Sequence, residues 1–335
     1  MPATLKDVAD HAKVSMRTVS NVVSGYEHVS KKMRERVMTA IADLDYRPNL
    51  VARTLRTGRT GMLALVVPEI DVPYFSELAR DVIRAATSFG YRVMIDQTGH
   101  DHERERDLLV GGDRNMLFDG ILFSPLATKA QLDAVEDRVT LPFVLLGEHE
   151  FDGRFDHVAI DNFKAAQEAT MHLLAIGRSR IAAIGEQPFE SYATPHLRTA
   201  GYLAALDSAG IASDADLIKP AVHYRRADGY AATQQLLKLP DRPDAIFCYS
   251  DILAMGAMRA VFDAGLIVPK DIAIIGIDDI EEGQYSRPTL STVSLDTEFI
   301  AHHAVATLAA RIDDPERTAE EVVAPHSLKV RESSA

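Results

Sequence analysis

The sequence has 335 residues and a formal net charge of -13. This length exceeds one typical domain, and it predicts a small domain joined to a body large enough to divide into two lobes. The longest apolar runs, at 62–67 and 272–277, have the length of buried strands, so we expect no membrane span. Charged residues interrupt the N-terminal segment at Lys6, Asp7, Asp10 and Lys13, so we expect no signal peptide. The lone Cys248 excludes an intrachain disulfide framework and indicates a cytoplasmic protein.

Charge is divided unevenly along the chain. Residues 1–60 hold eleven Lys and Arg against six Asp and Glu, a balance of +5, whereas the remainder carries -18. Opposite signs on a small head and a large body indicate two modules with different partners, and a basic head indicates an anionic partner. On charge alone, a solvated face that binds nothing stays open as the alternative.

Residues 1–46 predict three short helices. Thr4 and Asp7 form the ends of a capping box for the first helix, Ser15 begins the second, and Ser30 caps the third. Apolar residues recur at helical spacing on the inner faces, namely Leu5, Val8, Ala9 and Ala12, then Val19, Val22 and Val23, then Met33, Val37, Ala40, Ile41 and Leu44. Two helices joined by a tight turn and braced by a third match a helix-turn-helix, whose second helix enters the major groove.

A much shorter helical stretch follows. Residues 46–61 read YRPNLVARTLRTGRTG, with Asn49 as an N-cap and about a turn and a half of helix formers before Gly58. Isolated helices below ~12–15 residues are marginal in water. We therefore expect this hinge to be disordered until another molecule docks on it.

These motifs together resemble the lactose-repressor (LacI/GalR) family of transcription regulators. The similarity lies in TLKDVADHAKVSMRTVSNVVSG (4–25), YRPNLVARTLRTG (46–58), SDILAMGAMRA (250–260), IGIDDIEEGQYSRPTLSTV (275–293) and VRESS (330–334). It implies a ligand-responsive repressor that binds a pseudo-palindromic operator as a homodimer, with a tetramer left open. It implies no enzyme activity, no cofactor and no metal.

The resemblance places base reading on Met16, Arg17 and Asn21. Arginine can pair with guanine O6 and N7, asparagine suits adenine, and methionine offers apolar contact. The best-known family members carry Arg where this chain has Asn21, so we expect a different operator half-site. The last hinge leucine, here Leu55, is expected to wedge between base pairs. The expected DNA contacts are Lys6, Ser15, Met16, Arg17, Ser20, Asn21, Ser30, Asn49, Ala52, Arg53 and Leu55. Among the basic residues, Lys6, Lys31, Arg34 and Arg53 are expected to contact phosphates or only to raise the local potential.

The rest of the chain alternates strands and helices. Predicted strands lie at 62–67, 91–96, 120–124 and 143–147, with helices such as 74–89 and 128–138 between them, and the pattern restarts at 180–185, 244–250 and 272–278. Two such runs predict an α/β body of two doubly wound parallel sheets, which bind ligands at the carboxyl ends of their strands.

The resemblance implies a periplasmic-binding-protein type I fold whose chain crosses three times between the lobes. We place the crossings near Asp161, Val293 and Ala324. The predicted domains are a headpiece (1–46), a hinge (47–60) and a body (61–335), with lobe N at about 61–161 and 294–324 and lobe C at about 162–293 and 325–335.

A ligand pocket is expected in the cleft between the lobes. Strand ends and the resemblance point to Tyr74, Phe75, Glu148, Thr194, Arg198, Tyr224, Ser250, Asp251 and Asp278. Asp279 is expected to be structural, and Gly147 is the alternative to Glu148. A sugar is the first expectation for the effector, and a purine or another metabolite is the alternative. The sequence leaves open whether the effector induces or co-represses.

Two other classes of protein were weighed against a regulator. No glycine is followed by lysine and no G-x-S-x-G elbow occurs, which disfavours a P-loop enzyme or an α/β-hydrolase. The spacing of His100 and His102, and of the adjacent His302 and His303, does not suit metal chelation. A solute-binding protein would share the body but not the basic headpiece.

Overall fold

The structure, a computed structural model, consists of two units whose boundary lies between Thr60 and Gly61. It describes residues 3–23, 26, 28–46, 58–99, 101–110, 117–125, 139, 141–147, 153–187 and 193–335. Several predictions fall on other parts of the chain and lie outside the described residues: Asn49, Ala52, Arg53, Leu55, Glu148 and the helix at 128–138.

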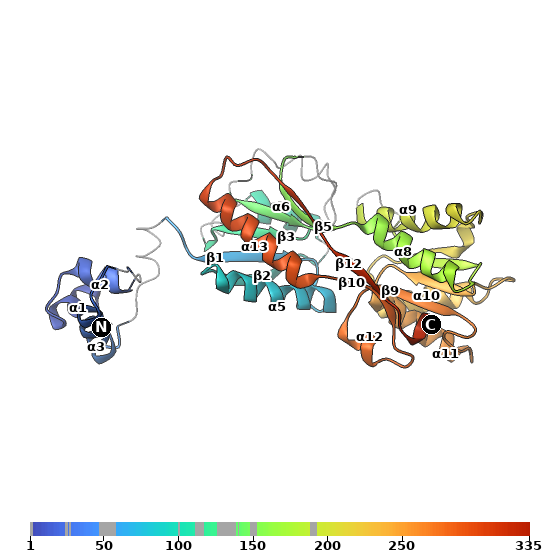
Figure 1. The fold of residues 1–335 in the computed structure, drawn as a ribbon, viewed down its shortest axis with the longest axis horizontal. Coiled ribbons are helices and arrows are strands. Elements are labelled where there is room, and N and C mark those ends of the chain that lie inside the picture. Colours follow the sequence, from blue (N-terminus) through green and yellow to red (C-terminus); the bar gives the residue numbers. More distant parts are fainter. Residues whose placement is uncertain are drawn as a thin grey trace. The chain divides into compact units, whose positions relative to one another are not determined.

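Three helices form the first unit: α1 (Leu5–His11), α2 (Met16–Val23) and α3 (Lys31–Asp43), drawn in blue in Figure 1. The predicted capping box is present, because the Thr4 hydroxyl accepts the Asp7 N–H while the Asp7 carboxylate accepts the Thr4 N–H at 2.8 Å. The Ser15 hydroxyl accepts the Thr18 N–H at 3.1 Å, and Ser30 caps α3. The predicted three-helix arrangement is therefore confirmed.

A small apolar core holds these helices together. Its buried members are Val8, Ala9, Ala12, Val19, Val22, Val37, Ala40 and Tyr46. The prediction that Val23 belongs to this face is wrong, because Val23 is 37% exposed. Val23 is the last residue of α2, and Val19 and Val22 already supply the buried side chains of that helix.

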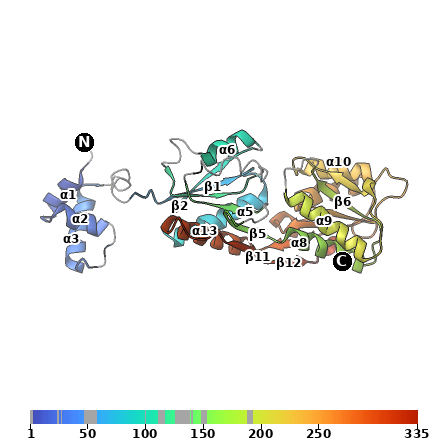
Figure 2. The ribbon, with the colours of Figure 1, turned by 90° about the horizontal axis from the view of Figure 1, so that it is seen from above.

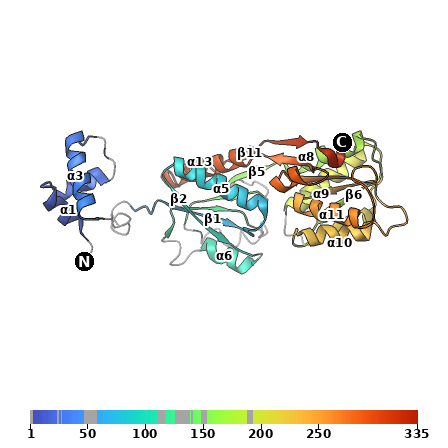
Figure 3. The ribbon, with the colours of Figure 1, turned by 90° about the horizontal axis from the view of Figure 1, so that it is seen from below.

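The sheet of lobe N has six parallel strands in the order β11-β5-β4-β3-β1-β2. They are β1 (Met62–Val67), β2 (Arg92–Gln97), β3 (Gly120–Phe123), β4 (Phe143–Leu146), β5 (Asp156–Ile160) and β11 (Glu321–Ala324). The helices described in this lobe are α5 (Pro73–Ser88), α6 (His102–Val110) and α13 (Thr297–Asp313). Figures 2 and 3 show α5 and α13 on one face of the sheet and α6 on the other.

Lobe C repeats this architecture, with strands in the order β12-β10-β9-β8-β6-β7 and only β12 antiparallel to its neighbour. The strands are β6 (Ile181–Glu186), β7 (Ile218–Pro220), β8 (Ala245–Cys248), β9 (Ala273–Asp278), β10 (Ser291–Leu295) and β12 (His326–Lys329). The α-helices are α8 (Asn162–Ala175), α9 (Ala193–Ser208), α10 (Arg226–Leu236), α11 (Asp251–Asp263) and α12 (Glu281–Tyr285), with short 3-10 turns at Ala215–Leu217 and Glu332–Ser334. The predicted doubly wound α/β fold is confirmed.

The first strand illustrates why the apolar runs form central strands. Leu63, Leu65 and Val67 of β1 pack into the core beneath α5 and α13, whereas Ala64 and Val66 pack into the core on the α6 side. Successive side chains of a strand point to opposite faces, so a strand that is covered on both faces is apolar throughout.

The chain crosses between the lobes three times, as the ribbons of Figures 1 and 2 show. It leaves lobe N after β5 and begins α8 at Asn162, it returns after β10 to form α13, and it crosses again at Pro325 between β11 and β12. The predicted crossing near Val293 comes too early. Val293 pairs with Ile277 and Leu328 inside β10, and this pairing continues to Leu295 before the chain leaves the sheet.

Candidate functional site

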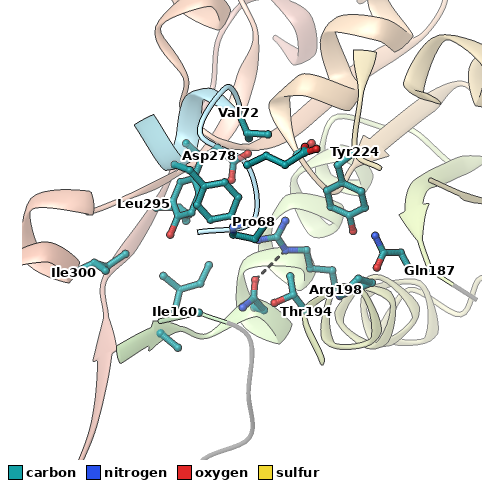
Figure 4. Close-up of a pocket in the computed structure, with 18 of the residues that line it drawn as sticks. Pro68, Val72, Ile160, Gln187, Thr194, Arg198, Tyr224, Asp278, Leu295 and Ile300 are labelled. Atoms are coloured by element: carbon teal, nitrogen blue, oxygen red, sulfur yellow. Dashed lines mark hydrogen bonds between the residues drawn. The ribbon is translucent and has the colours of Figure 1, made fainter. Parts of the chain in front are cut away.

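A cavity lies between the two lobes at the carboxyl ends of their strands. Lobe N contributes Glu69 after β1 and Gly147 after β4, and lobe C contributes Gln187 after β6 and Asp278 at the end of β9. The space is about 1000 Å³, part of which is open to solvent. Ligands bind at this edge of doubly wound sheets, and we call the space the interlobe cavity (Figure 4).

Arg198 is the buried cation of the interlobe cavity. It lies on α9 and is 7% exposed. Its Nε donates to the side-chain oxygen of Asn162 at 2.9 Å, and its Nη1 donates to the backbone carbonyl of Tyr249. Figure 4 shows the bond to Asn162 as a dashed line. These bonds fix the plane of the guanidinium, which has five N–H donors, and they leave capacity for a polar ligand.

Two hydroxyl groups also line the cavity. Thr194 lies one helical turn before Arg198 and is 3% exposed, and its hydroxyl has no hydrogen-bond partner among the described residues. A buried hydroxyl without a partner is costly, so this group is suited to a ligand. The hydroxyl of Ser250 accepts the Leu253 N–H at 3.3 Å and thereby caps α11.

Aromatic side chains from both lobes face the cavity. Tyr74 and Phe75 lie at the start of α5, with ring centroids 5.1 Å apart and an edge-to-face arrangement. Across the cleft, the Tyr224 hydroxyl donates to the Gly185 carbonyl at 2.7 Å. Tyr224 has a φ of +47°, a conformation that costs energy in a non-glycine residue and that clusters at functional sites.

Consecutive aspartates at the end of β9 have separate surroundings. Asp278 lines the interlobe cavity and has a φ of +124°. Asp279 instead accepts a hydrogen bond from Nη2 of Arg331 at 2.6 Å, which ties it to the C-terminal segment. The geometry therefore agrees with the expectation of a structural role for Asp279.

Asp251 does not line the cavity, which corrects its prediction as a ligand-binding residue. It is completely buried, and its carboxylate accepts hydrogen bonds from the Thr292 hydroxyl at 2.7 Å and the Ile280 N–H at 3.1 Å. Burial raises the pKa of this carboxyl well above its usual range. Asp251 is the first residue of α11, and its side chain turns toward β9 and β10. There it packs directly against Gly276, which has no side chain to obstruct it.

The second candidate site is the outer face of α2 in the headpiece. Met16 is 53% exposed and Arg17 is exposed, whereas Ser20 and Asn21 are half-buried. Lys6, Ser15 and Ser30 are exposed as well. Two other arginines of the headpiece are held by its own backbone. Arg34 donates to the carbonyl of Tyr26 at 2.8 Å, and Arg36 donates to the carbonyls of Ala12 and Lys13, each at 2.5 Å.

Comparisons with known proteins match both units. Residues 4–49 match the profile of "Bacterial regulatory proteins, lacI family", and residues 170–334 match that of a "Periplasmic binding protein-like domain". The chain is 35% identical to the HTH-type transcriptional repressor CytR of Escherichia coli (strain K12) over 311 residues, which cover 91% of this chain and 89% of that protein. The chain belongs to the lacI family of bacterial regulators. It is a ligand-responsive transcriptional regulator of the repressor type.

Other lacI-family proteins are similar over nearly the whole length. The Ribose operon repressor of Haemophilus influenzae is 33% identical, covering 99% of this chain and 98% of that protein. Among solved structures, the Lac repressor dimer bound to operator and the anti-inducer ONPF has a TM-score of 0.86 at 27% identity, covering 100% of this chain and 99% of that one. The complex of the regulator CelR with cellobiose has a TM-score of 0.73 at 30% identity, with 99% of each chain covered.

Several lining residues of this lacI-family chain were not predicted from the sequence. Glu69 lies two residues after β1 and Gln187 directly follows β6, so the strand-end rule that led to Asp278 could have found them. Asn162 and His223 follow no predicted strand, and only the folded chain brings them to the cavity. Gly147, the alternative to Glu148, lines the cavity too.

In the described part of the chain, no helix is long and apolar enough to cross a membrane.

Proposed function

We propose that this lacI-family protein represses transcription in the cytoplasm by binding a pseudo-palindromic operator as a homodimer, and that a small uncharged effector in the interlobe cavity alters its affinity for DNA. The observation that carries the effector site is the cavity wall around Arg198 and Thr194. A guanidinium held at two points and a buried hydroxyl without a described partner form a polar corner that a hydroxyl-rich ligand can complete.

The lining favours a sugar or a sugar-containing molecule. Asp278 and Arg198 supply an acceptor and donors for hydroxyl groups, while Phe75 and Tyr224 supply apolar faces for a ring. The CelR structure holds cellobiose, and another relative is a Ribose operon repressor, which supports this class of ligand. A purine stacked on Phe75 is the second candidate, since a repressor named PurR is also 32% identical over 99% of this chain.

Charge in the interlobe cavity disfavours a phosphorylated effector. Glu69 and Asp278 are acidic, and Arg198 is the one lysine or arginine among the described lining residues. The stretches 148–152 and 188–192, which adjoin lining residues in the sequence, contain acidic residues but no lysine or arginine. A phosphate ester carries a charge of about -1.5 to -2 at pH 7. Because Arg225 neutralises Glu69 and Asp278 opposes Arg198, no unmatched cation among the described lining residues would balance that charge.

An apolar edge of lobe N supports the homodimer. β2 is an edge strand of its sheet and exposes Met94 and Ile95, and α5, which packs beside β2, exposes Ile83. Met94 and Ile95 point to opposite faces of the sheet, so apolar side chains are exposed on both sides of this edge. Exposed apolar side chains that gather at one edge mark association surfaces, and soluble oligomers are most often twofold dimers. A tetramer stays open.

Base reading is proposed for α2, with Met16, Arg17 and Asn21 at the DNA. Lys6, Ser15, Ser20, Ser30 and Arg53 would position the protein on the phosphates. Leu55 would enter the minor groove, with Asn49 and Ala52 on the same hinge. Arg34 is a weaker candidate than the sequence indicated, because its guanidinium already binds the Tyr26 carbonyl.

A thermal-shift screen and an operator titration test the proposal together. Ribose, cellobiose, cytidine and hypoxanthine would be compared with ribose 5-phosphate for stabilisation of the full chain. Binding to DNA flanking its own gene would then be measured by fluorescence anisotropy with and without each stabilising compound. Stabilisation by an uncharged compound together with a changed operator affinity is expected, whereas specific DNA binding that no cavity ligand alters would contradict the effector role.

A further inference from the structure

An arginine of lobe C pairs with two acidic residues of lobe N, one of which lines the interlobe cavity. Nη2 of Arg225 lies 2.6 Å from Oε1 of Glu69, and Nη1 lies 2.9 Å from Oδ2 of Asp71. Glu69 and Asp71 follow β1 of lobe N, whereas Arg225 precedes α10 of lobe C. We propose that Arg225, Glu69 and Asp71 form an ion-pair latch that holds the two lobes closed over the effector site.

The two arms of the latch differ in their exposure to solvent. The Glu69 side chain is 17% exposed and lines the interlobe cavity, whereas the Asp71 side chain is 67% exposed. Solvent screens exposed ion pairs strongly, so salt should weaken the Asp71 arm more than the Glu69 arm. The hydrogen bond from the guanidinium lowers the pKa of Asp71, as expected for an acid that is paired in its charged form.

Local structure anchors Arg225 to lobe C. Its backbone N–H donates to the Asp228 carboxylate at 3.0 Å, where α10 begins. The preceding Tyr224 is fixed by the bond from its hydroxyl to the Gly185 carbonyl. With its backbone fixed at both sides, the arginine can keep its bonds to Glu69 only while lobe N stays close, so opening the cleft requires breaking the pairs.

The latch connects the effector site to lobe closure through one residue. Glu69 is at once part of the cavity wall and a partner of Arg225 at 2.6 Å. A ligand shifts an equilibrium between open and closed lobes only by its differential affinity for the two states. Arg225 is therefore a positioning residue, which sets the open–closed balance on which the proposed effector would act.

Adjacent Arg226 provides a matched control. Arg226 forms an ion pair with Glu282 at 3.6 Å, and both residues belong to lobe C, whereas its charge acts on Asp71 of lobe N only as the smallest cause of the lowered Asp71 pKa. Arg225→Ala and Arg226→Ala thus remove the same charge at neighbouring positions, but only the first breaks hydrogen-bonded ion pairs between the lobes.

Hydrogen exchange of the effector-free full chain tests the latch without an identified ligand or DNA. Arg225→Ala should speed amide exchange in the segments 68–72 and 222–226 by about two- to fivefold, the range for a partly exposed ion pair. Arg226→Ala should leave the 68–72 segment of lobe N at the wild-type rate, and 1 M salt should bring wild type close to Arg225→Ala. Equal exchange in the two variants would overturn the latch.

A double-mutant cycle gives an independent measurement. In urea unfolding at low salt, Arg225→Ala and Glu69→Gln should be non-additive, with a coupling of about two- to fivefold in the unfolding constant that shrinks at high salt. Strict additivity would mean that the lobes do not hold this pair in solution, which overturns the proposal. Neither measurement depends on operator or effector binding, so a failed latch and a failed repressor assignment remain distinguishable.

Discussion

Arg198 and Asn162 join the effector site to the first crossing between the lobes. Nε of Arg198 on α9 donates to the Asn162 side-chain oxygen at 2.9 Å, and Asn162 is the first residue of α8, directly after the chain leaves lobe N. Both side chains are buried. Arg198, the proposed ligand-binding cation, is therefore held by Asn162, a residue of the crossing itself.

Loss of this contact should weaken the effector response. Asn162→Ala removes a hydrogen bond to a charged group, worth about 1.5–3 kcal/mol, so the effector concentration for half-response should rise tenfold or more. Operator affinity without effector should stay close to wild type. Asn162→Asp, which keeps an acceptor for the guanidinium, should lose much less. An operator titration over a range of effector concentrations measures this, and equal losses in the two variants would contradict the positioning role.

The two aspartates Asp278 and Asp251 should respond oppositely to substitution. Asp278→Ala should abolish the effector response with little loss of stability, because its side chain faces the interlobe cavity. Asp251→Ala should leave the Thr292 hydroxyl and the Ile280 N–H unmatched in the core and lower the free energy of unfolding by about 1–3 kcal/mol for each. Urea unfolding and effector titration of both variants separate the effects. A fully stable Asp251→Ala protein that lacks only the effector response would restore Asp251 to the ligand site.

Base reading by the headpiece is testable with a paired substitution. Arg17→Ala should cost roughly 1–3 kcal/mol of operator binding and relax the preference at one base pair per half-site, because Arg17 is exposed on α2. Lys31→Ala should weaken binding to all sequences alike. Binding to a library of half-site variants measures both. An unchanged preference profile for Arg17→Ala would mean that another element reads the bases.

Residues whose role depends on local pattern were predictable from the sequence. The capping box of Thr4 and Asp7 needs only residues three apart, and the central strand β1 is a continuous apolar run. Asp278 and Ser250 were found because strand ends meet at one edge of a sheet. The weaker strands β5, β7, β11 and β12 mix polar and apolar residues or are very short, so they gave no comparable signal.

Residues whose role depends on side-chain direction or distant partners were not predictable. Ser250 and Asp251 both follow β8, and only the fold shows that the serine faces the cavity while the aspartate turns into the core. The pairing of Arg225 with Glu69 joins residues 156 positions apart. No periodicity or spacing rule connects such residues, because the closure of two lobes brings them together.

Protonation of His157 should make the stability of lobe N depend on pH. His157 on β5 is 2% exposed, and its Nε2 donates to the Gly147 carbonyl at 3.1 Å, which assigns the neutral tautomer with its proton on Nε2. Burial lowers the pKa of His157 below its ordinary value near 6.5. Below that value His157 is protonated in the unfolded chain but still neutral in the folded chain. The free energy of unfolding therefore falls as the pH drops toward the pKa of the folded state.

Replacing His157 and replacing its neighbour Glu321 should change this pH dependence of stability in opposite directions. His157→Gln keeps a donor for Gly147 but does not titrate, so its melting temperature should fall less than that of wild type between pH 7.5 and 5.5. The Glu321 carboxylate lies 3.5 Å from Nδ1 and favours the charged ring, so Glu321→Gln should lower the pKa of His157 further and steepen the fall. Thermal melts of the three proteins at both pH values measure this. The same pH dependence in all three proteins would show that protonation of His157 does not cause it. The position of Gly147 in the cavity wall would then not depend on the charge of His157.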